Sequence, residues 1–390
     1  MQKNTQFPIY LIAIGAFALG MASYVTAGLI PMIESSFSVS ISMAAQLVTA
    51  FTLAYGLGSP VFVALMPAEK QKMGLLIALG LFFLANACSA LVTNFTWLIV
   101  FRALAGIGAG VYLAMGIAAS ASISGPGNQG RTIAVIMGGM ASGVVLGVPL
   151  GLLLAQHFGW QSTFWLISLL GAVSFIGLAL KLPTLPAGQV SSLAEKIAIL
   201  GDTHVLTILI VSLLAAISSL GMYTFIAPLV TSPDFSINIS LTSYLWSWGI
   251  GGVVGSFLIG PIVDRIKGSW LTLCIMVLLA VSLLSLPWLA NINQWLLIVP
   301  IVLWGAVGWA LQVPQNNELI SARQKKGDGN LAVALNESAL YLGSAIGAAA
   351  GGIMLSFEFP IWMLATVAGL VAVLGCIVQL LNINRVSHND

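Results

Sequence analysis

Charged side chains are scarce in this sequence. They make up 6% of the 390 residues, whereas 59% are hydrophobic. Soluble domains are about 25% charged and about 45–50% apolar. A water-soluble globule of this length could not cover its surface with 13 basic and 11 acidic side chains. The shortage excludes a soluble enzyme, a disordered chain and a nucleic-acid-binding protein, and it favours a protein that crosses a membrane several times.

Cysteine is also rare. The three cysteines, Cys88, Cys274 and Cys376, all lie within apolar runs and show no CxxC or Cys/His spacing. They therefore predict neither a disulfide framework nor a metal site. We find no nucleotide-binding domain in the sequence and expect no enzymatic activity and no cofactor. The energy source, where there is one, is then an ion gradient, and the proton gradient is our expectation.

Long apolar segments fill most of the chain. Each is long enough to cross about 30 Å of hydrocarbon as a helix, and the length of the chain accommodates roughly twelve such spans. The sequence predicts an all-α polytopic membrane protein with an N-terminal six-helix bundle (1–182), a cytoplasmic linker (183–204) and a C-terminal six-helix bundle (205–390). The expected spans lie near residues 7–30, 42–66, 73–92, 96–123, 131–156, 161–182, 205–230, 240–263, 269–289, 294–320, 329–355 and 359–383.

The distribution of basic residues predicts the orientation. Basic residues collect in cytoplasmic loops of membrane proteins. With the N-terminus inside, twelve of the 13 basic residues fall on the cytoplasmic side, and no Lys or Arg falls on the other. We therefore expect both termini in the cytoplasm. The twelve are Lys3, Lys70, Lys72, Arg131, Lys181, Lys196, Arg265, Lys267, Arg323, Lys325, Lys326 and Arg385.

Glycines repeat between the two halves. Gly143, Gly147 and Gly151 are spaced four apart in the fifth span, and Gly343, Gly347 and Gly351 are spaced alike 200 residues later. Gly106 has a counterpart in Gly308. Small residues let helices approach closely, and Pro149 predicts a kink in the fifth span. Two parallel six-helix repeats are a known transporter plan.

Several motifs resemble the major facilitator superfamily over essentially the whole chain. The similarity is greatest to the drug:proton antiporters, in the branch of sugar-efflux and purine-efflux permeases. The stretches that carry it are Gly28-Leu-Ile-Pro31, Tyr55-Gly-Leu-Gly-Ser-Pro60, Arg102-Ala-Leu-Ala-Gly106, Gly147-Val-Pro-Leu-Gly151, Gly159-Trp160, Gly308-Trp-Ala-Leu, and Asn336 before Ser338.

The resemblance implies a monomeric bacterial inner-membrane protein that exports a small solute (a purine base or nucleoside, a sugar or a drug) in exchange for protons. Its antiporter signature would comprise Gly143, Gly147, Pro149 and Gly151. Two departures are present. No Asp-Arg pair follows Gly58, and Ser23 stands where many relatives carry a carboxylate.

Two ionisable residues lie well inside the predicted spans, Arg102 and Glu337. A charge at mid-membrane costs about 2.5–3.5 kcal/mol on insertion scales and tends to mark a pathway. We interpret both as proton-coupling residues. The alternative for Glu337 is a structural, hydrogen-bonded carboxyl group, and for Arg102 it is a side chain that snorkels to the interface.

The eighth span ends in a charged pair, Asp264–Arg265, which follows Gly260-Pro261. In the family this stretch holds one access state, so we interpret Gly260, Asp264 and Arg265 as gating residues. The alternative is an ordinary pair of charges at a helix end, which contributes little in water.

Polar and aromatic residues inside the spans form the remaining candidates. Side-chain amides can donate and accept hydrogen bonds toward a purine edge or sugar hydroxyls. Their alternative role is hydrogen bonding between helices, and for aromatic residues it is packing or an interfacial position. The expected substrate-cavity residues are Gln46, Tyr112, Tyr223, Trp246, Gln312, Gln315, Asn316 and Asn336.

Three functions stay open at this point. The first is the proton-driven exporter, with the small solute, protons and the bilayer as partners and no nucleic acid. The second is a facilitator or proton-symport importer on the same fold. The third is a non-transporting membrane receptor, which the absence of a sensory domain in the sequence disfavours.

Overall fold

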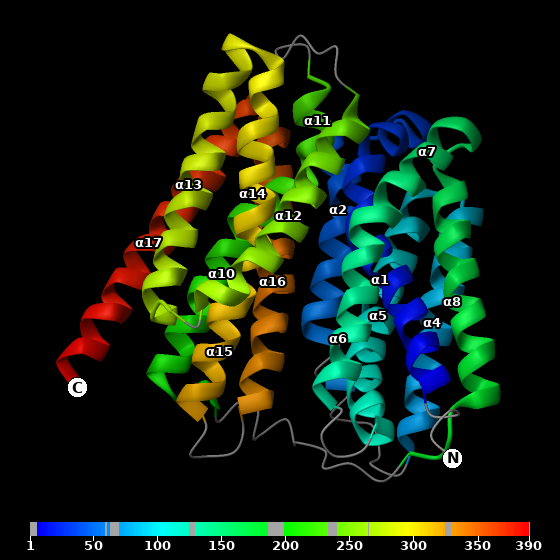
Figure 1. Cartoon of the computed structure of the whole chain (residues 1–390). Coiled ribbons are helices and arrows are strands. Elements are labelled where there is room, and N and C mark those ends of the chain that lie inside the picture. Colours follow the sequence, from blue (N-terminus) through cyan, green and yellow to red (C-terminus); the bar gives the residue numbers. More distant parts are fainter. Residues whose placement is uncertain are drawn as a thin grey trace. The chain divides into compact units, whose positions relative to one another are not determined.

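A computed structural model describes residues 6–58, 61–62, 70–124, 129–185, 199–232, 240–263, 265–323 and 329–389. The regular secondary structure in these ranges is helical (Figure 1), and eleven segments are long and apolar enough to cross a membrane. The remaining expected span, 240–263, coincides with helix α12 (Leu241–Val263). The predicted all-α membrane fold is confirmed.

The chain divides into two units. The first comprises Met1–Ser40 and Ala50–Leu193, and the second comprises Ile41–Thr49 and Ala194–Asp390. The division after Leu193 falls inside the expected linker, of which residues 186–198 lie outside the described ranges.

The first helices along the chain are α1 (Gln6–Phe37), α2 (Ile41–Leu53), the π-helical turn η2 (Ala54–Gly58), α4 (Gln71–Leu91), α5 (Phe95–Ser124), α6 (Gln129–Ser142), the π-helical turn η4 (Gly143–Gly147), α7 (Val148–Phe158) and α8 (Gln161–Lys181). The second unit continues with α10 (Thr203–Thr224), α11 (Ile226–Val230), α12, α13 (Gly268–Ile292), the short 3-10 helix η5 (Gln294–Leu297), α14 (Ile298–Ala310), α15 (Gln312–Arg323), α16 (Gly329–Ser356) and α17 (Trp362–Asn389).

The helices of the two units pack in the same order. In the first unit α1 packs against α6 and α8, and α4 packs against α5 and α8. In the second unit α10 packs against α16 and α17, and α13 packs against α14 and α17. Each pairing of the first six spans thus recurs in the last six, as two parallel repeats require.

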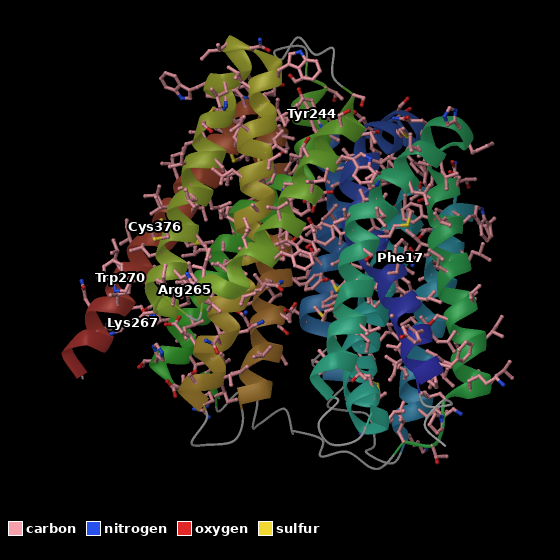
Figure 2. All side chains as sticks on the ribbon, viewed as in Figure 1. Phe17, Tyr244, Arg265, Lys267, Trp270 and Cys376 are labelled. Atoms are coloured by element: carbon pink, nitrogen blue, oxygen red, sulfur yellow. The ribbon has the colours of Figure 1, made fainter. Side chains whose placement is uncertain are left out.

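Glycines let the first and fifth spans of each unit touch backbone to backbone. Phe17 lies in α1 and is labelled in Figure 2. A Cβ atom at Gly143 would collide with its carbonyl oxygen. In the second unit Gly347 meets the carbonyl oxygen of Ile217 in the same way. Gly139 and Gly343 make the same kind of contact with the carbonyl oxygens of Ala13 and Leu213, so each unit has two such glycines one helical turn apart.

The glycines of the fourth and tenth spans make different contacts. Gly106 lies against the carbonyl oxygen of Phe51, and Gly305 lies against that of Trp248. A Cβ at Gly308 would lie 2.9 Å from the Ser219 hydroxyl oxygen. A glycine of this span thus meets a backbone carbonyl in each unit, and the match of Gly106 with Gly308 stays a prediction.

The kink expected from Pro149 takes the form of a π turn. Residues Gly143–Gly147 form η4, and Pro149 follows in the first turn of α7. Proline has no N–H and displaces the carbonyl four residues before it, so a wider turn accommodates the ring.

An ion pair holds the start of α10 to the end of α15. Asp202 caps α10 by accepting from the backbone N–H of His204 and Val205, and Arg323 Nη1 lies 3.0 Å from Asp202 Oδ2. Arg323 is buried, and Leu319, one turn before it, belongs to the apolar cluster beneath the pair. Two segments about 120 residues apart are thereby joined.

Two opposing effects act on the pKa of Asp202. Partial burial acts to raise it. Hydrogen bonds from the backbone N–H of Val205 and from the Arg323 guanidinium outweigh burial, so the pKa is lowered from its ordinary value.

A first prediction concerns Gly143. Gly143→Ala should lower the free energy of unfolding by about 1–3 kcal/mol, because the new methyl group forces α1 and η4 apart. Gly138→Ala is the matched control, since a Cβ there meets nothing within 4 Å. The measurement is the thermal unfolding midpoint in detergent. Equal midpoints for the two variants would contradict the role of the close contact.

A second prediction concerns Asp202. Its lowered pKa means that the ion pair stabilises the fold fully above about pH 4 and that this stabilisation is lost as the pH falls further. Asp202→Asn keeps the helix cap and should abolish that acid-dependent loss. Asp202→Ala should in addition cost about 0.5–2 kcal/mol at neutral pH. Unfolding midpoints between pH 7 and pH 3 check both, and an unchanged acid slope in Asp202→Asn would contradict the assignment.

Candidate functional site

Arg102 lies at the centre of the first unit. It projects from α5, is fully buried, and donates from Nη2 to the carbonyl oxygen of Ala22 in α1 at 2.9 Å. Nη1 lies 3.5 Å from Oδ1 of Asn86 in α4. The guanidinium also stacks over the rings of Phe51 and Phe164, 4.3 and 5.5 Å from their centroids. The side chain is enclosed by protein and has no exposed surface.

No carboxylate neutralises Arg102 within the described part of the chain. Its Nε has no hydrogen-bond partner there, and neither does the buried hydroxyl of Thr26. Ser23 donates to the carbonyl of Leu19 in its own helix. A backbone carbonyl, a side-chain amide and two ring faces therefore balance the positive charge of Arg102. An electronegative group that reaches the site would be attracted to it.

A polar network joins three helices of the second unit. The Ser212 hydroxyl in α10 bonds to the side-chain amides of Gln315 in α15 and Asn336 in α16. Asn336 Nδ2 donates to Asn316 Oδ1 at 2.8 Å. Ser212, Gln315 and Asn336 are all buried. The atoms that face the Ser212 hydroxyl are both amide oxygens, Gln315 Oε1 and Asn336 Oδ1, and its single proton is donated to one of them at a time.

Glu337 is the residue after Asn336 in α16 but is not part of this network. It is half-buried in α16, about 12 Å along the helix from its start. Its carboxylate makes no hydrogen bond or ion pair with any residue that the structure describes. Glu318 in α15 is also half-buried and lies beside Gly268 of α13. The second unit thus holds two carboxylates within its spans that have no internal counter-charge among the described residues.

Aromatic rings fill the middle of the second unit. Tyr223 and Trp248 have ring centroids 4.4 Å apart, and Trp304 lies 6.3 Å from Trp248 and donates from Nε1 to Ser219 Oγ at 2.8 Å. All three rings are buried. Tyr223 is therefore a packing residue in this structure. Trp246, on another face of α12, is half-buried.

The remaining expected cavity residues divide by burial. Tyr112 is fully buried and donates to the carbonyl oxygen of Ile12 at 2.9 Å, so it packs α5 against α1 and does not line a cavity. Gln46 is half-buried and donates to the carbonyl oxygen of Ser42 at 3.2 Å. Gln312 is half-buried at the start of α15. The half-buried candidates are Gln46, Trp246, Gln312 and Asn316; Tyr112, Tyr223, Gln315 and Asn336 are enclosed by packing.

The expected gating residues are only partly described. Arg265 is exposed between α12 and α13, close to Lys267 (Figure 2). Gly260 lies in the last turn of α12, and Asp264 lies outside the described residues. The gating role of the Asp264–Arg265 pair stays a prediction.

Sequence reasoning did not identify Ser212, Thr26 or the pairing of Asp202 with Arg323. One serine in an apolar helix carries no signal of its partners, and Asp202 and Arg323 belong to segments that are distant in the sequence. Thr26 has no hydrogen-bond partner among the described residues, and only the fold shows that it is buried.

Two helical bundles with the same packing order and a buried polar centre in each define a membrane transport protein. The sequence pattern of the Major Facilitator Superfamily matches residues 12–328. The chain belongs to this superfamily, and its partners include a small-molecule substrate and the lipid bilayer.

Curated relatives include a transport protein and a drug-resistance protein. The chain is 30% identical over 372 residues to the inner membrane transport protein YdhP of Escherichia coli K12, covering 94% of this chain and 95% of that protein. It is 29% identical over 265 residues to a chloramphenicol resistance protein of Streptomyces lividans, covering 66% and 67%.

Solved structures share the fold. The nucleoside transporter NupG superposes with a TM-score of 0.77 at 12% identity, over 97% of this chain and 100% of that one. A bacterial homologue of the human lysosomal transporter Spinster, in an inward-facing conformation, gives 0.76 at 14% identity, over 98% and 97%.

A third prediction concerns Ser212. Ser212→Ala should cost about 1–3 kcal/mol of unfolding free energy, because it leaves the amides of Gln315 and Asn336 buried without their shared partner. Ser218→Ala in the same helix is the control, since that hydroxyl bonds only to carbonyls of its own helix. Unfolding midpoints in detergent compare the two, and an equal loss in both would refute the network.

Proposed function

We propose that this protein exports a small solute across the bacterial cytoplasmic membrane in exchange for protons. It would work as a monomer with both termini in the cytoplasm. The observation that carries the proposal is Glu337, a carboxylate inside a span with no partner among the described residues. The inner-membrane relative YdhP and the chloramphenicol resistance protein support the location and the direction.

Glu337 would carry the proton. Burying an ionised carboxylate in hydrocarbon is costly, so a bundle with this residue moves between its two access states more readily when the group is neutral. Rocking of the two six-helix repeats about the substrate would then couple protonation to transport. Arg102 is the proposed second participant, since its uncompensated charge favours an electronegative group in its neighbourhood.

The substrate class follows from the half-buried candidates. Gln312 and Asn316 offer amide donors and acceptors, and Trp246 offers a ring face. A purine base or nucleoside, a sugar or an aromatic drug such as chloramphenicol fits this chemistry. The solved nucleoside transporter and the chloramphenicol resistance protein represent two of these classes. Growth of overexpressing cells on toxic members of each class would separate them.

A facilitator or proton-symport importer is the second candidate. The observation that favours it is Ser23, which leaves the first unit without the span-one carboxylate found in many exporters of this family. Counterflow in proteoliposomes without proton movement would identify a facilitator, and accumulation driven by an inward proton gradient would identify a symporter.

A fourth prediction tests the role of Glu337. In inside-out proteoliposomes, an interior-acid proton gradient should drive substrate uptake by the unmodified protein. Glu337→Gln should reduce this uptake to the gradient-independent rate, about tenfold or more, because the neutral amide cannot bind and release a proton.

Glu318→Gln is the matched control, since Glu318 is also a half-buried carboxylate within a span of the second unit. It should keep most of the gradient-driven uptake. Gradient-driven uptake that persists in Glu337→Gln, or that is lost only in Glu318→Gln, would overturn the assignment.

A further inference from the structure

A groove on the first unit is lined by lysines at one end and by apolar side chains along its length. It lies between α4 and α8, which run side by side in Figure 1, and has a volume of about 740 Å³. Its lining residues include Lys70, Lys72, Leu81 and Phe175, and the segment just after α8 adds Thr184 and Leu185. All of them belong to the first unit.

The apolar wall comes from one face of α4. Met73, Ile77, Gly80 and Leu84 follow one another at intervals of three or four residues, so they lie on one side of the helix. Met73, Ile77 and Leu84 are each more than half exposed. Exposed apolar side chains on a membrane-spanning helix face lipid. The groove therefore opens toward the bilayer.

Gly80 makes the groove deep. A Cβ at this position would lie 3.5 Å from the ring of Phe175 in α8, which is ordinary contact, so the absent side chain leaves space beside the ring. Phe175 is held by Phe83, with ring centroids 5.4 Å apart. The hollow is thus bounded by α4 on one side and by α8 on the other.

The length of the groove matches one lipid leaflet. About eleven residues separate Met73 from Leu84, which is about 17 Å of helix at 1.5 Å per residue. One leaflet is about half of a 30 Å hydrocarbon core, or about 15 Å. An extended acyl chain that enters at the lysines would run along the wall to the middle of the membrane.

The lysines set the chemistry of the occupant. Lys70 is exposed just before α4, and Lys72 is half-buried in its first turn. The Lys72 ammonium donates to the carbonyl oxygen of Leu182, the residue that follows α8, and an ammonium has two further protons to donate. The lining residues include no acidic side chain. Basic pockets between spans at the cytoplasmic side favour anionic headgroups.

We propose that this groove binds an anionic phospholipid of the cytoplasmic leaflet, with its phosphate between Lys70 and Lys72 and one acyl chain along α4 beside Phe175. The site rests on the orientation proposed above, since both lysines then lie at the cytoplasmic surface. It is separate from Glu337 and Arg102. The test below measures lipid binding and not flux, so its failure and a failure of the transport proposal are distinguishable.

The experiment compares two lipids with identical acyl chains. Protein purified in mild detergent and stripped of lipid is mixed with phosphatidylglycerol or phosphatidylcholine, and bound lipid is counted by native mass spectrometry. Phosphatidylglycerol should be retained at least about fivefold better, since each basic residue near the surface contributes roughly that factor. Equal retention of the two lipids would overturn the proposal.

Two variants separate the headgroup site from the groove. Lys70→Gln/Lys72→Gln should lower phosphatidylglycerol binding at least about fivefold. Gly80→Leu keeps both lysines, fills the hollow beside Phe175 and should lower the binding of both lipids. The control is Lys267→Gln/Arg385→Gln, which removes the same charge from exposed positions outside the groove. A control that loses as much binding as the test variants contradicts the site.

A measurement on the unmodified protein does not depend on the folding of any variant. Phosphatidylglycerol with a photoreactive group in its acyl chain should label peptides that contain residues 73–84 and Phe175. Glycerol phosphate, which lacks acyl chains, should not compete. Labelling confined to other helices, or displacement by glycerol phosphate, would overturn the proposal.

Discussion

Inside a bilayer there is no water to satisfy a polar group, so each such group in this chain must find its partner within the protein or remain costly. Arg102 meets this constraint by reaching the carbonyl of Ala22 and the amide of Asn86. Ser212 meets it by joining two buried amides from α15 and α16. These bonds connect helices that are distant in the sequence, and they determine which face of each helix turns inward.

Close backbone contact supplies the rest of the cohesion. Lipid tails are as apolar as leucine side chains, so spans gain little from hiding apolar surface and associate through tight packing instead. Gly143 against Phe17 and Gly347 against Ile217 bring the same pair of spans into contact in each unit. The π turn at Gly143–Gly147 then accommodates Pro149 without separating α1 from its neighbour. The glycines and the proline act together in one packing feature.

The sequence predicted the spans, because length and hydropathy follow directly from the thickness of the bilayer. It also predicted which positions would be glycine contacts, but not their register. An offset in numbering cannot show that Gly305, and not Gly308, meets the carbonyl of Trp248. For Tyr112 the residue type indicated a hydroxyl group and an aromatic ring. Only the fold shows that its hydroxyl donates a hydrogen bond to the carbonyl oxygen of Ile12. Site residues depend on partners, and partners depend on tertiary contacts.

Asn336 and Glu337 show how two neighbouring polar residues of one helix can differ in their partners. They are adjacent in α16, so they point about 100° apart. Asn336 is buried and fully engaged, while Glu337 is half-buried with no partner among the described residues. An unpaired carboxylate contributes nothing to packing and costs stability in a membrane. Arg102 is the corresponding case in the first unit, a cation without a carboxylate among the described residues. The spans thus hold charges with no counter-charge among the described residues, Arg102 in the first unit and Glu337 and Glu318 in the second. A proton can neutralise Glu337 and an electronegative group can balance Arg102, which is the chemistry that the proposed exchange of protons for a polar solute would use.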